Sequence, residues 1–247
     1  MIIHSYENGL RADACIEYIR GLESLEEVET LILLPIPSTR DKCTITNTKV
    51  YINEVLDKID GKTVITGYGL PKDFLSAARE RDCAVLDLSC DEEFLLANAV
   101  LTAVCALGII LGTTKQAPSD MRVGIVGYGR IGKRLTDLFL YLGAFVRVFS
   151  SRQDTRVDLG ACGVSSEISR EDADLSGLDV LINTAPARIF DVYSIPEELR
   201  IIDLASGDNF PGLSTVETYP SIPARMFPKS AGKEWGRAIE RYIANNP

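Results

Sequence analysis

The first half of the chain alternates short apolar runs with amphipathic stretches. Its continuous apolar runs have the length of buried parallel strands and lie at residues 30–34, 63–66 and 83–88. The stretches between these runs carry apolar side chains at helical spacing, at residues 50–59 and 71–81. Residues 1–5 look like a further strand, with no strand–helix unit in front of it. The alternation predicts a parallel sheet covered by helices.

A second series of the same kind follows the polar linker at residues 113–120. Its apolar runs predict strands at residues 121–126, 144–149, 180–183 and 201–204. Helices are predicted at residues 130–142 and, after a proline-rich loop, at residues 230–244. Two successive series predict an α/β protein with two Rossmann-like or flavodoxin-like domains, each built on a parallel sheet.

The segment between the two series, residues 94–112, carries no charged side chain and is long enough to span a bilayer as a helix. Two interpretations stay open. The first is a helix buried on all sides between domains or subunits, which the acidic residues 91–93 favour because they suit the first turn of a soluble helix. The second is a membrane span. If one chain covers only half of the helix, the remaining apolar patch favours a homodimer.

These elements give a domain division. We expect an N-terminal α/β domain over residues 1–93, an interdomain helix over residues 94–112 and a dinucleotide-binding domain over residues 113–228. The C-terminal helix, residues 229–247, is expected to pack back on the first domain.

The composition and net charge of the chain limit the classes of function that it can have. The 247 residues are 46% hydrophobic and 25% charged, which is typical of a folded globular protein. The net charge is −9 and the 26 basic residues are scattered, which argues against a nucleic-acid partner but leaves small anions open.

The number of histidines and the spacing of the cysteines limit the kinds of catalytic and metal site that we expect. His4 is the single histidine and is expected to be a structural residue at a strand end, so catalytic triads and histidine-based metal sites are not expected. The six cysteines show no C-x-x-C spacing, and no signal peptide opens the chain. Reduced thiols, a cytoplasmic location and no metal site are the expectation.

The strand at residues 121–126 leads into a G-x-G-x-x-G motif that opens the next helix. In the sequence Gly127-Tyr128-Gly129-Arg130-Ile131-Gly132, the first glycine permits a tight turn and the second lets a pyrophosphate approach the backbone. The third lets helix and strand pack closely, and the N-terminus of the helix offers free N–H groups to phosphates. This context predicts a dinucleotide site.

Ser150, Ser151 and Arg152 follow the next strand, where an NAD enzyme usually presents an acid to the ribose. Two hydroxyls and a guanidinium suit a 2′-phosphate, which favours NADP and leaves NAD open. Loops at residues 183–186 and 203–206 end strands on the same edge and are expected to wall the site. The residues predicted to bind the dinucleotide are Gly127, Tyr128, Gly129, Arg130, Ile131, Gly132, Ser150, Ser151, Arg152, Thr184, Ala185, Pro186, Leu204 and Ala205.

Three motifs after the glycine turn resemble the family of dipicolinate synthase A chains. They are Asn183-Thr184-Ala185-Pro186, Asp203-Leu204-Ala205-Ser206 and Pro228-Lys229-Ser230-Ala231-Gly232. The Leu34-Pro35 loop and Asn98 fit the same alignment, so the likeness covers most of the chain. That family is similar in architecture to the two-domain D-2-hydroxyacid dehydrogenases.

The resemblance implies NADP-dependent oxidation of a dihydrodipicolinate-type precursor to dipicolinate during sporulation, together with a separate, flavoprotein-like second subunit. A small dicarboxylate substrate needs cations or N–H donors. Lys229 and Ser230 at the start of a helix are candidates for one carboxylate, and Arg188 and Arg40 on strand-end loops for the other. Asn98 is a further candidate from the alignment. A homo-oligomer is expected.

The sequence departs from that family at two places. The chain starts near the family's second strand, so its N-terminus is expected to be shortened. In the long helix, Leu101-Thr102-Ala103-Val104-Cys105 stands where the family has Pro-Thr-Val-Glu-Gly, so an acid is replaced by an apolar residue. These departures keep a second hypothesis open, a dinucleotide-binding sensor or assembly subunit without catalysis.

Overall fold

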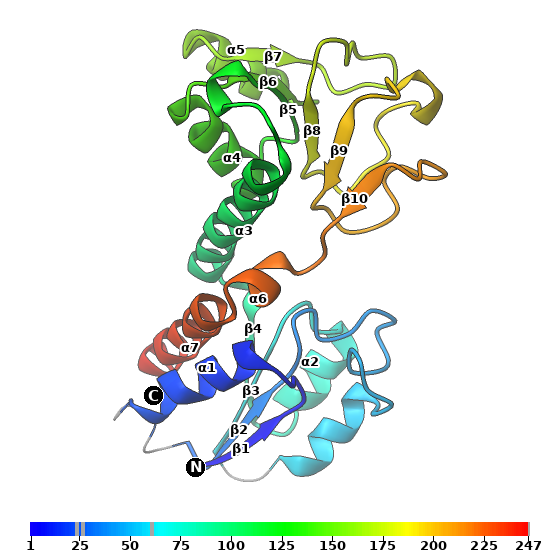
Figure 1. Ribbon diagram of the computed structural model, residues 1–247. Coiled ribbons are helices and arrows are strands. Elements are labelled where there is room, and N and C mark those ends of the chain that lie inside the picture. The colour runs from blue at the N-terminus through cyan, green and yellow to red at the C-terminus, as the bar shows by residue number, and fades with distance from the viewer. Residues whose placement is uncertain (23–24, 26–27, 60–61, 247) are drawn as a thin grey trace. The chain divides into compact units, whose positions relative to one another are not determined.

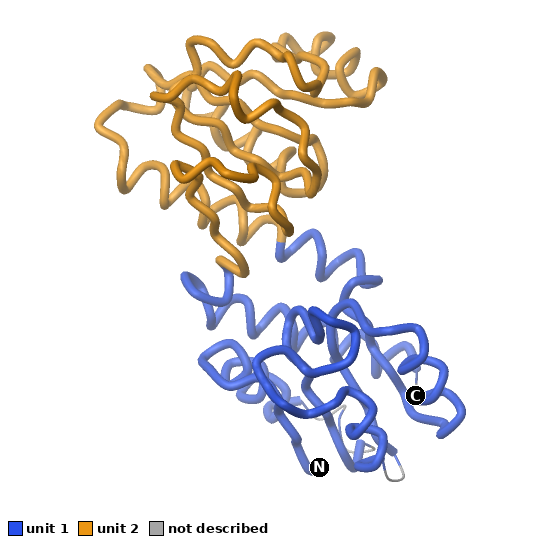
Figure 2. The backbone as a smooth tube through the Cα atoms, turned by 90° about the vertical axis from the view of Figure 1, so that its right-hand side faces the viewer, with its two compact units in different colours: residues 1–98, 223–247 blue, residues 99–222 orange. Residues whose placement is uncertain are grey.

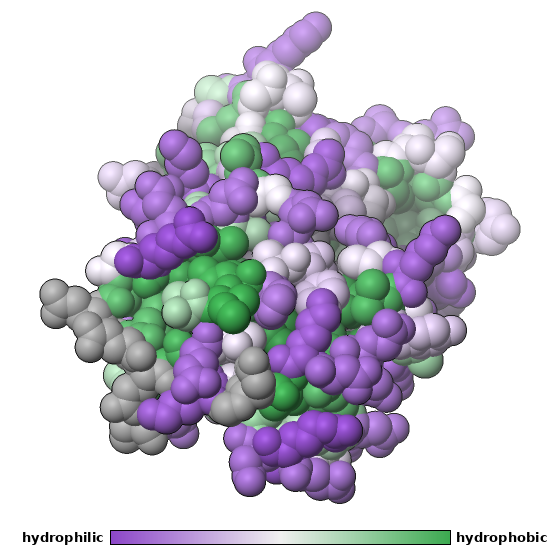
Figure 3. All heavy atoms as spheres, turned by 90° about the horizontal axis from the view of Figure 1, so that it is seen from below, coloured by the Kyte–Doolittle hydropathy of each residue, from purple (hydrophilic) through white to green (hydrophobic). Residues whose placement is uncertain are grey.

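The computed structural model describes residues 1–22, 25, 28–59 and 62–246, and the chain forms two compact units. Unit 1 consists of Met1–Asn98 together with Pro223–Pro247, and unit 2 of Ala99–Ile222 (Figure 2). The surface is mixed, and on the face in Figure 3 hydrophilic side chains separate smaller apolar patches.

Unit 1 is built on a four-stranded parallel sheet in the order β1-β2-β3-β4. Its strands are β1 Ile2–Ser5, β2 Thr30–Leu33, β3 Thr63–Gly67 and β4 Ala84–Asp87. All residues of β2 and β3 are buried, which explains why both appear in the sequence as continuous apolar runs. The helical elements are α1 Leu10–Arg20, η2 Ile52–Lys58, α2 Lys72–Arg79, η3 Leu88–Cys90 and α7 Pro228–Asn245. The predicted parallel sheet is confirmed.

Helix α7 lies against α1 (Figure 1), and glycine permits the close approach. A Cβ atom on Gly232 would come within 2.3 Å of the Arg11 carbonyl oxygen, so only glycine fits there. One turn further on, the fully buried Trp235 donates from Nε1 to Thr66 Oγ1 at 3.0 Å. The C-terminal helix therefore completes the core of unit 1.

Two elements of unit 1 differ from the sequence prediction. Helix α1 lies in a charged stretch to which no element was assigned, and the chain thus opens with a strand, a loop and a helix. Its buried face is made largely of small side chains, Ala12, Ala14 and Cys15, which give a weak apolar signal. The predicted helix over residues 50–59 is a 3₁₀ helix, η2, in which Ile52, Val55 and Leu56 reach the core.

Unit 2 is built on a six-stranded parallel sheet in the order β10-β9-β8-β5-β6-β7. Counted along the chain from β5, this is the order 6-5-4-1-2-3, in which the direction of winding reverses between β5 and β8. The strands are β5 Arg122–Val126, β6 Phe145–Phe149, β7 Ser165–Glu167, β8 Val180–Asn183, β9 Arg200–Asp203 and β10 Val216–Thr218. Ligands of doubly wound sheets bind at such a reversal point, at the carboxyl ends of the strands.

The helical elements of unit 2 are η4 Pro118–Asp120, α4 Arg130–Tyr141, α5 Gln153–Ala161 and η5 Val192–Ser194, and α6 Ile222–Met226 begins at its last residue. Helix α5 and strands β7 and β10 were not predicted. Each of these two strands has three residues, and no residue of either strand is fully buried, so neither appears in the sequence as an apolar run. Helix α5 exposes most of its residues, and only Leu159 is buried.

Helix α3, Glu92–Thr113, corrects the prediction of a helix buried on all sides. Ala103, Ala106 and Ile110 on one face are fully buried in the core of unit 2. On another face Val100 and Val104 are about two-fifths exposed, at 40% and 39%. The helix is long and apolar enough to cross a membrane by length and composition, which is weak evidence because core helices of soluble proteins pass the same test.

Candidate functional site

The glycine turn lies between β5 and α4, at the reversal point of the unit 2 sheet. Gly127 follows the strand with φ +86°, a conformation that favours glycine, and donates its N–H to the Phe149 carbonyl at 2.9 Å. Gly129 caps the helix, and its carbonyl accepts from Lys133 N–H at 2.9 Å. The free N–H groups of the first turn of α4 therefore face the carboxyl edge of the sheet.

The three glycines of this turn meet different surroundings. A Cβ atom on Gly132 would lie 2.1 Å from the Gly127 carbonyl oxygen, so the helix packs on the turn as only glycine allows. A Cβ atom on Gly129 would meet nothing within 4 Å. The open space at Gly129 is what a pyrophosphate needs to reach the backbone. The turn therefore fits a dinucleotide.

Other residues of the motif support the turn from the side. Tyr128 and Ile131 are half-buried against the core of unit 2, and Lys133 Nζ stands 5.5 Å from the centre of the Tyr128 ring. Burial raises the pKa of the Tyr128 hydroxyl. Arg130 is exposed at the first position of α4. Tyr128 and Ile131 therefore stabilise the turn.

The loop after β8 is joined to the glycine turn by Thr184. Its hydroxyl donates to the Val126 carbonyl at 2.8 Å and reaches the Gly127 carbonyl at 3.4 Å, while its N–H donates to the Val126 carbonyl at 2.9 Å. Ala185 is half-buried beside it, and Pro186 is exposed. The structure thus brings the predicted residues of both loops together at one edge.

A buried polar network fixes the loops after β8 and β9. Asn183 donates from Nδ2 to Asp203 Oδ1 at 2.8 Å, and Asn209 donates to Asp203 Oδ2 at 3.0 Å. Ala205 N–H donates to Asp203 Oδ1 at 3.1 Å, and Leu204 N–H to the Asn183 carbonyl at 3.0 Å. A buried carboxylate needs donors of this kind to offset the loss of its contacts with water. Asp203 therefore holds both loops in place.

Sequence reasoning found Asn183 and Asp203 but missed Asn209. Asn209 lies in an irregular loop, and only the fold shows that its amide meets the carboxylate. Beside it a cavity of about 370 Å³ opens, lined by polar side chains including Asp208, Ser214 and Thr218. Space for a ligand therefore adjoins the network.

The segment after β6 differs from the expectation of three free contacts to a phosphate. Ser150 is buried, and its Oγ accepts from the Arg152 N–H at 3.3 Å, so its side chain supports the loop. Its carbonyl accepts from Arg156 Nη1 at 2.6 Å. Ser151 is exposed. The Arg152 guanidinium is exposed and binds Asp154 at 2.6 Å, which raises the pKa of Arg152 and holds that of Asp154 well below its usual range.

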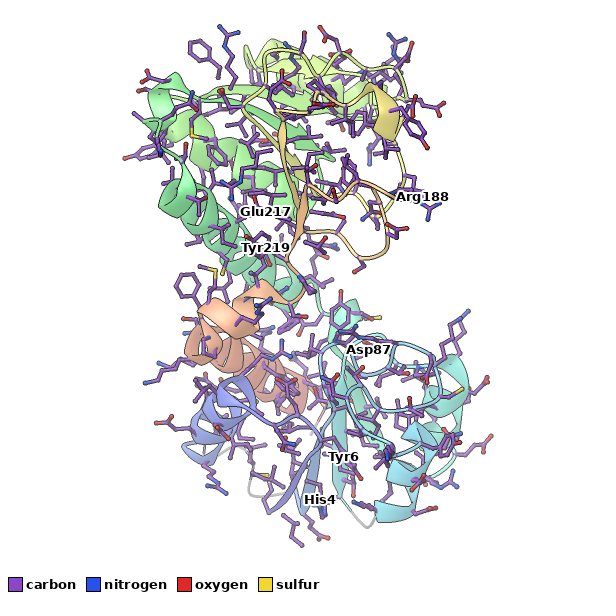
Figure 4. All side chains as sticks on the ribbon, turned by 45° about the vertical axis from the view of Figure 1, so that its right-hand side comes forward. His4, Tyr6, Asp87, Arg188, Glu217 and Tyr219 are labelled. Carbon is purple, nitrogen blue, oxygen red and sulfur yellow. The ribbon has the colours of Figure 1, made fainter. Side chains whose placement is uncertain are left out.

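The five candidates for substrate binding are divided between the units. Arg188 belongs to unit 2, where it donates to the Asp208 carbonyl at 2.9 Å and forms an ion pair with the Asp208 carboxylate at 3.1 Å (Figure 4). The other four belong to unit 1. Of these Lys229 and Ser230 are exposed in the first turn of α7, Arg40 is exposed in the loop after β2, and Asn98 is half-buried on α3. The structure does not bring the five together within one unit.

The carboxyl edge of the unit 1 sheet holds charged groups that the sequence did not single out. Asp87, labelled in Figure 4, accepts N–H groups of Gly69, Leu70 and Ser89 at 2.9 to 3.0 Å. Arg11 and Glu7 form a two-pronged ion pair at 2.6 and 2.7 Å near the end of β1. Both groups are fully used in shaping loops, so they are structural. His4, in the middle of β1, is half-buried.

No protein-family model and no curated protein matches the sequence. Solved structures do match. The A chain of dipicolinate synthase from Bacillus halodurans aligns with a TM-score of 0.78 at 20% identity, over 98% of this chain and 97% of that chain. The A chain of dipicolinate synthase from Bacillus subtilis aligns with a TM-score of 0.77 at 17% identity, over 99% and 95%.

A 2-hydroxyacid dehydrogenase also matches this chain in structure. The D-isomer-specific 2-hydroxyacid dehydrogenase from Lactobacillus delbrueckii ssp. bulgaricus, in an NAD-complexed form, aligns with a TM-score of 0.58 at 11% identity, over 99% and 96% of the two chains. These likenesses extend over nearly the whole length of every chain compared. The protein therefore has the fold of the dipicolinate synthase A chains and of the 2-hydroxyacid dehydrogenases, as its motifs predicted.

Proposed function

We propose that the protein is an oxidoreductase dependent on a nicotinamide dinucleotide. The observation that carries the proposal is the glycine turn at the reversal point of the six-stranded sheet. The turn leaves open space for a ligand at Gly129, and at Gly132 the helix packs directly against the Gly127 carbonyl. Phosphates would bind the N–H groups of the first turn of α4, with Thr184, Ala185, Pro186, Leu204 and Ala205 forming the wall beside the nicotinamide. When bound, the cofactor accepts a hydride from the substrate.

NADP is the cofactor that we favour over NAD. No acidic residue ends β6, since Phe149 is followed by Ser150 and Ser151. Arg152 is exposed, and its partner Asp154 is exposed as well, so a 2′-phosphate can replace that carboxylate at small cost. NADP carries a 2′-phosphate that can take the place of the Asp154 carboxylate on the Arg152 guanidinium, whereas NAD has no such group.

The substrate class that we propose is a small dicarboxylate of the dihydrodipicolinate type, oxidised to the aromatic product. The support is the Pro228-Lys229-Ser230-Ala231-Gly232 motif together with the shared fold. Lys229 and Ser230 lie in the first turn of an 18-residue helix, where N–H groups and a cation favour a carboxylate. Arg188, Arg40 and Asn98 are the remaining binding candidates. Aromatisation drives the reaction, so no histidine base is needed.

A flavoprotein-like second subunit, a cytoplasmic location and a role in sporulation complete this proposal. The second subunit and the role in sporulation rest on the resemblance to the dipicolinate synthase A chains, and the cytoplasmic location rests on six cysteines without C-x-x-C spacing.

A second candidate function rests on α3. Where the family carries an acid in this helix, Val104 stands here, and it is 39% exposed. A dinucleotide-binding protein without turnover, acting as a sensor or in assembly, would need the glycine turn but not that acid.

A turnover assay separates the two functions. The purified protein is incubated with NADP⁺ and freshly prepared dihydrodipicolinate-type precursor, and formation of reduced nicotinamide is followed by its absorbance. The matched variants are Lys229→Ala and Lys72→Ala, the second an exposed lysine on α2 of the same unit. Reduction that depends on Lys229 but not on Lys72 supports the dehydrogenase. Absence of reduction in the wild type, although NADP⁺ binds, supports the non-catalytic function.

A further inference from the structure

A cavity of about 380 Å³ lies at the amino edge of the unit 2 sheet, where strands β5, β6 and β7 begin. Its volume falls within the range of small-molecule sites, about 300 to 1,000 Å³. The glycine turn lies at the opposite, carboxyl edge of the same sheet. Four residue steps along β5 separate Arg122 at the cavity from Val126 before the turn, which is roughly 13 Å. The cavity is therefore separate from the dinucleotide site.

The connection between β7 and β8 explains why this end of the sheet is open. A crossover between parallel strands is usually a helix, but residues 168–179 form an irregular loop. Ala173 and Leu175 of this loop are buried in the core of unit 2, whereas Gly177 lines the cavity. The start of β6 stays uncovered, and the Phe145 side chain is 67% exposed there.

Two arginines bring positive charge to the cavity. The register of β5 and β6 pairs Arg122 with Phe145, so Arg122, Phe145 and Arg147 share one face of the sheet. The Arg122 side chain is exposed and has no ion-pair or hydrogen-bond partner among the residues that the structure describes. Gly177 leaves room for it, since a Cβ atom there would lie 3.4 Å from Arg122 Nη1. Arg147 donates from Nη1 to the Asp174 carbonyl at 2.9 Å.

The charge of these arginines is poorly balanced nearby. In the described part of this chain, whose net charge is −9, no aspartate or glutamate lines the cavity. Glu167 Oε2 stands 4.0 Å from Arg147 Nη1, and both side chains are partly exposed, so this contact offsets only part of the charge. A guanidinium binds a carboxylate or a phosphate through two parallel N–H bonds. The exposed Phe145 ring offers an apolar surface beside them, on which an aromatic ring can pack.

We propose that this cavity binds a small aromatic anion, whose carboxylate or phosphate is held by Arg122 and Arg147 and whose ring packs against Phe145. The site is additional to the cofactor and substrate sites proposed above and does not rest on them. Carboxylate and phosphate groups share the geometry that a guanidinium recognises, so the choice between them is made by experiment.

The test is a nuclear magnetic resonance titration of the full chain with benzoate, phenyl phosphate, acetate and inorganic phosphate. Benzoate or phenyl phosphate should shift the backbone amide signals of Gly163, Ser165 and Gly177 in a saturable way, and the tighter of the two identifies the anionic group. Acetate and inorganic phosphate lack the ring and should bind at least about fivefold more weakly. Equal affinity with and without the ring would overturn the proposal, as would the absence of saturable shifts at these residues.

Two pairs of variants test the residues. Arg122→Ala should weaken binding of the aromatic anion about tenfold, whereas Arg134→Ala, an exposed arginine of α4 outside the cavity, should not. Phe145→Ala should weaken it about fivefold and leave acetate unaffected, whereas Tyr193→Ala, 94% exposed, should change neither. An Arg122→Ala variant that binds like the wild type would overturn the proposal, as would equal losses in Arg122→Ala and Arg134→Ala.

The Arg122→Ala variant is expected to fold normally. The Arg122 side chain lacks a partner among the described residues, and its backbone N–H keeps the hydrogen bond to Asp179 Oδ2 at 2.7 Å. Calorimetric titration of this variant with NADP⁺ should match the wild type, so loss of the anion site is distinguishable from loss of the cofactor site.

Discussion

Substituting alanine at Gly129 and at Gly132, one at a time, separates ligand binding from folding in the glycine turn. At Gly129 a Cβ atom meets no protein atom within 4 Å, and φ is −84°, so the backbone accepts alanine without strain. We expect the free energy of unfolding to change by less than about 1 kcal/mol. The methyl group stands instead where a pyrophosphate approaches. Binding of NADP⁺ should fall at least about tenfold, or about 1.4 kcal/mol.

The same change at Gly132 acts on the fold itself. Its Cβ atom would lie 2.1 Å from the Gly127 carbonyl oxygen and 3.0 Å from the carbonyl carbon, and backbone atoms cannot rotate away. Helix α4 must move by roughly 1 Å in a close-packed core, which costs about 2 to 3 kcal/mol. Gly132→Ala should therefore lower the free energy of unfolding of the chain and weaken cofactor binding together.

Two measurements check this pair. Urea unfolding without ligand gives the free energy of unfolding of each variant, and calorimetric titration gives its dissociation constant for NADP⁺. Gly129→Ala with wild-type stability and wild-type affinity would refute the assignment of the turn to the pyrophosphate. Gly132→Ala with wild-type stability would refute the packing argument.

Three further predictions concern cofactor choice, the buried network and pH. Arg152→Ala should weaken NADP⁺ binding by about tenfold and leave NAD⁺ binding unchanged in titrations, whereas equal loss of both would contradict the 2′-phosphate assignment. Asp203→Asn should cost about 2 to 3 kcal/mol in urea unfolding, since one of the two acceptor oxygens becomes an NH₂ donor that faces a buried amide donor, and a neutral result would show that the network does not hold the loops. Glu217 has its pKa lowered chiefly by hydrogen bonds from Arg200, so it contributes stability above about pH 5 that is lost as the pH falls through its lowered pKa. Glu217→Gln should therefore lower the melting temperature at pH 7, by an amount equivalent to less than about 1 kcal/mol, with the difference closing as the pH falls through the lowered pKa of Glu217, and a difference independent of pH would contradict this.

The sequence predicts best where burial is two-sided and the motif is local. Strands β2 and β3 are buried throughout and appear as unbroken apolar runs, and the glycine turn is contiguous in the chain. Helix α1 shows the opposite case. Its buried face consists largely of small residues amid charges, and the glycines of α7 that receive it lie more than 200 residues away. Contacts of that kind cannot be read from periodicity.

The candidate site shows a similar limit. Ser150 and Arg152 look like free phosphate ligands in the sequence, yet one is buried beneath its own loop and the other is paired with Asp154. Hydropathy likewise left open whether α3 is a helix buried on all sides or a membrane span, because the apolar composition of a helix does not show which faces have neighbours. The fold determines which side chains pair with one another and which faces of a helix are covered, and the sequence alone does not show this.

Binding of a dinucleotide together with a dicarboxylate is the central property that we expect of this protein. Calorimetric titration of the full chain with NADP⁺ and with NAD⁺, each with and without dipicolinate, measures this. We expect tighter binding of NADP⁺ than of NAD⁺, and tighter binding of NADP⁺ when dipicolinate is present. Absence of binding for both dinucleotides would contradict this expectation and reduce the glycine turn to a structural element of the fold.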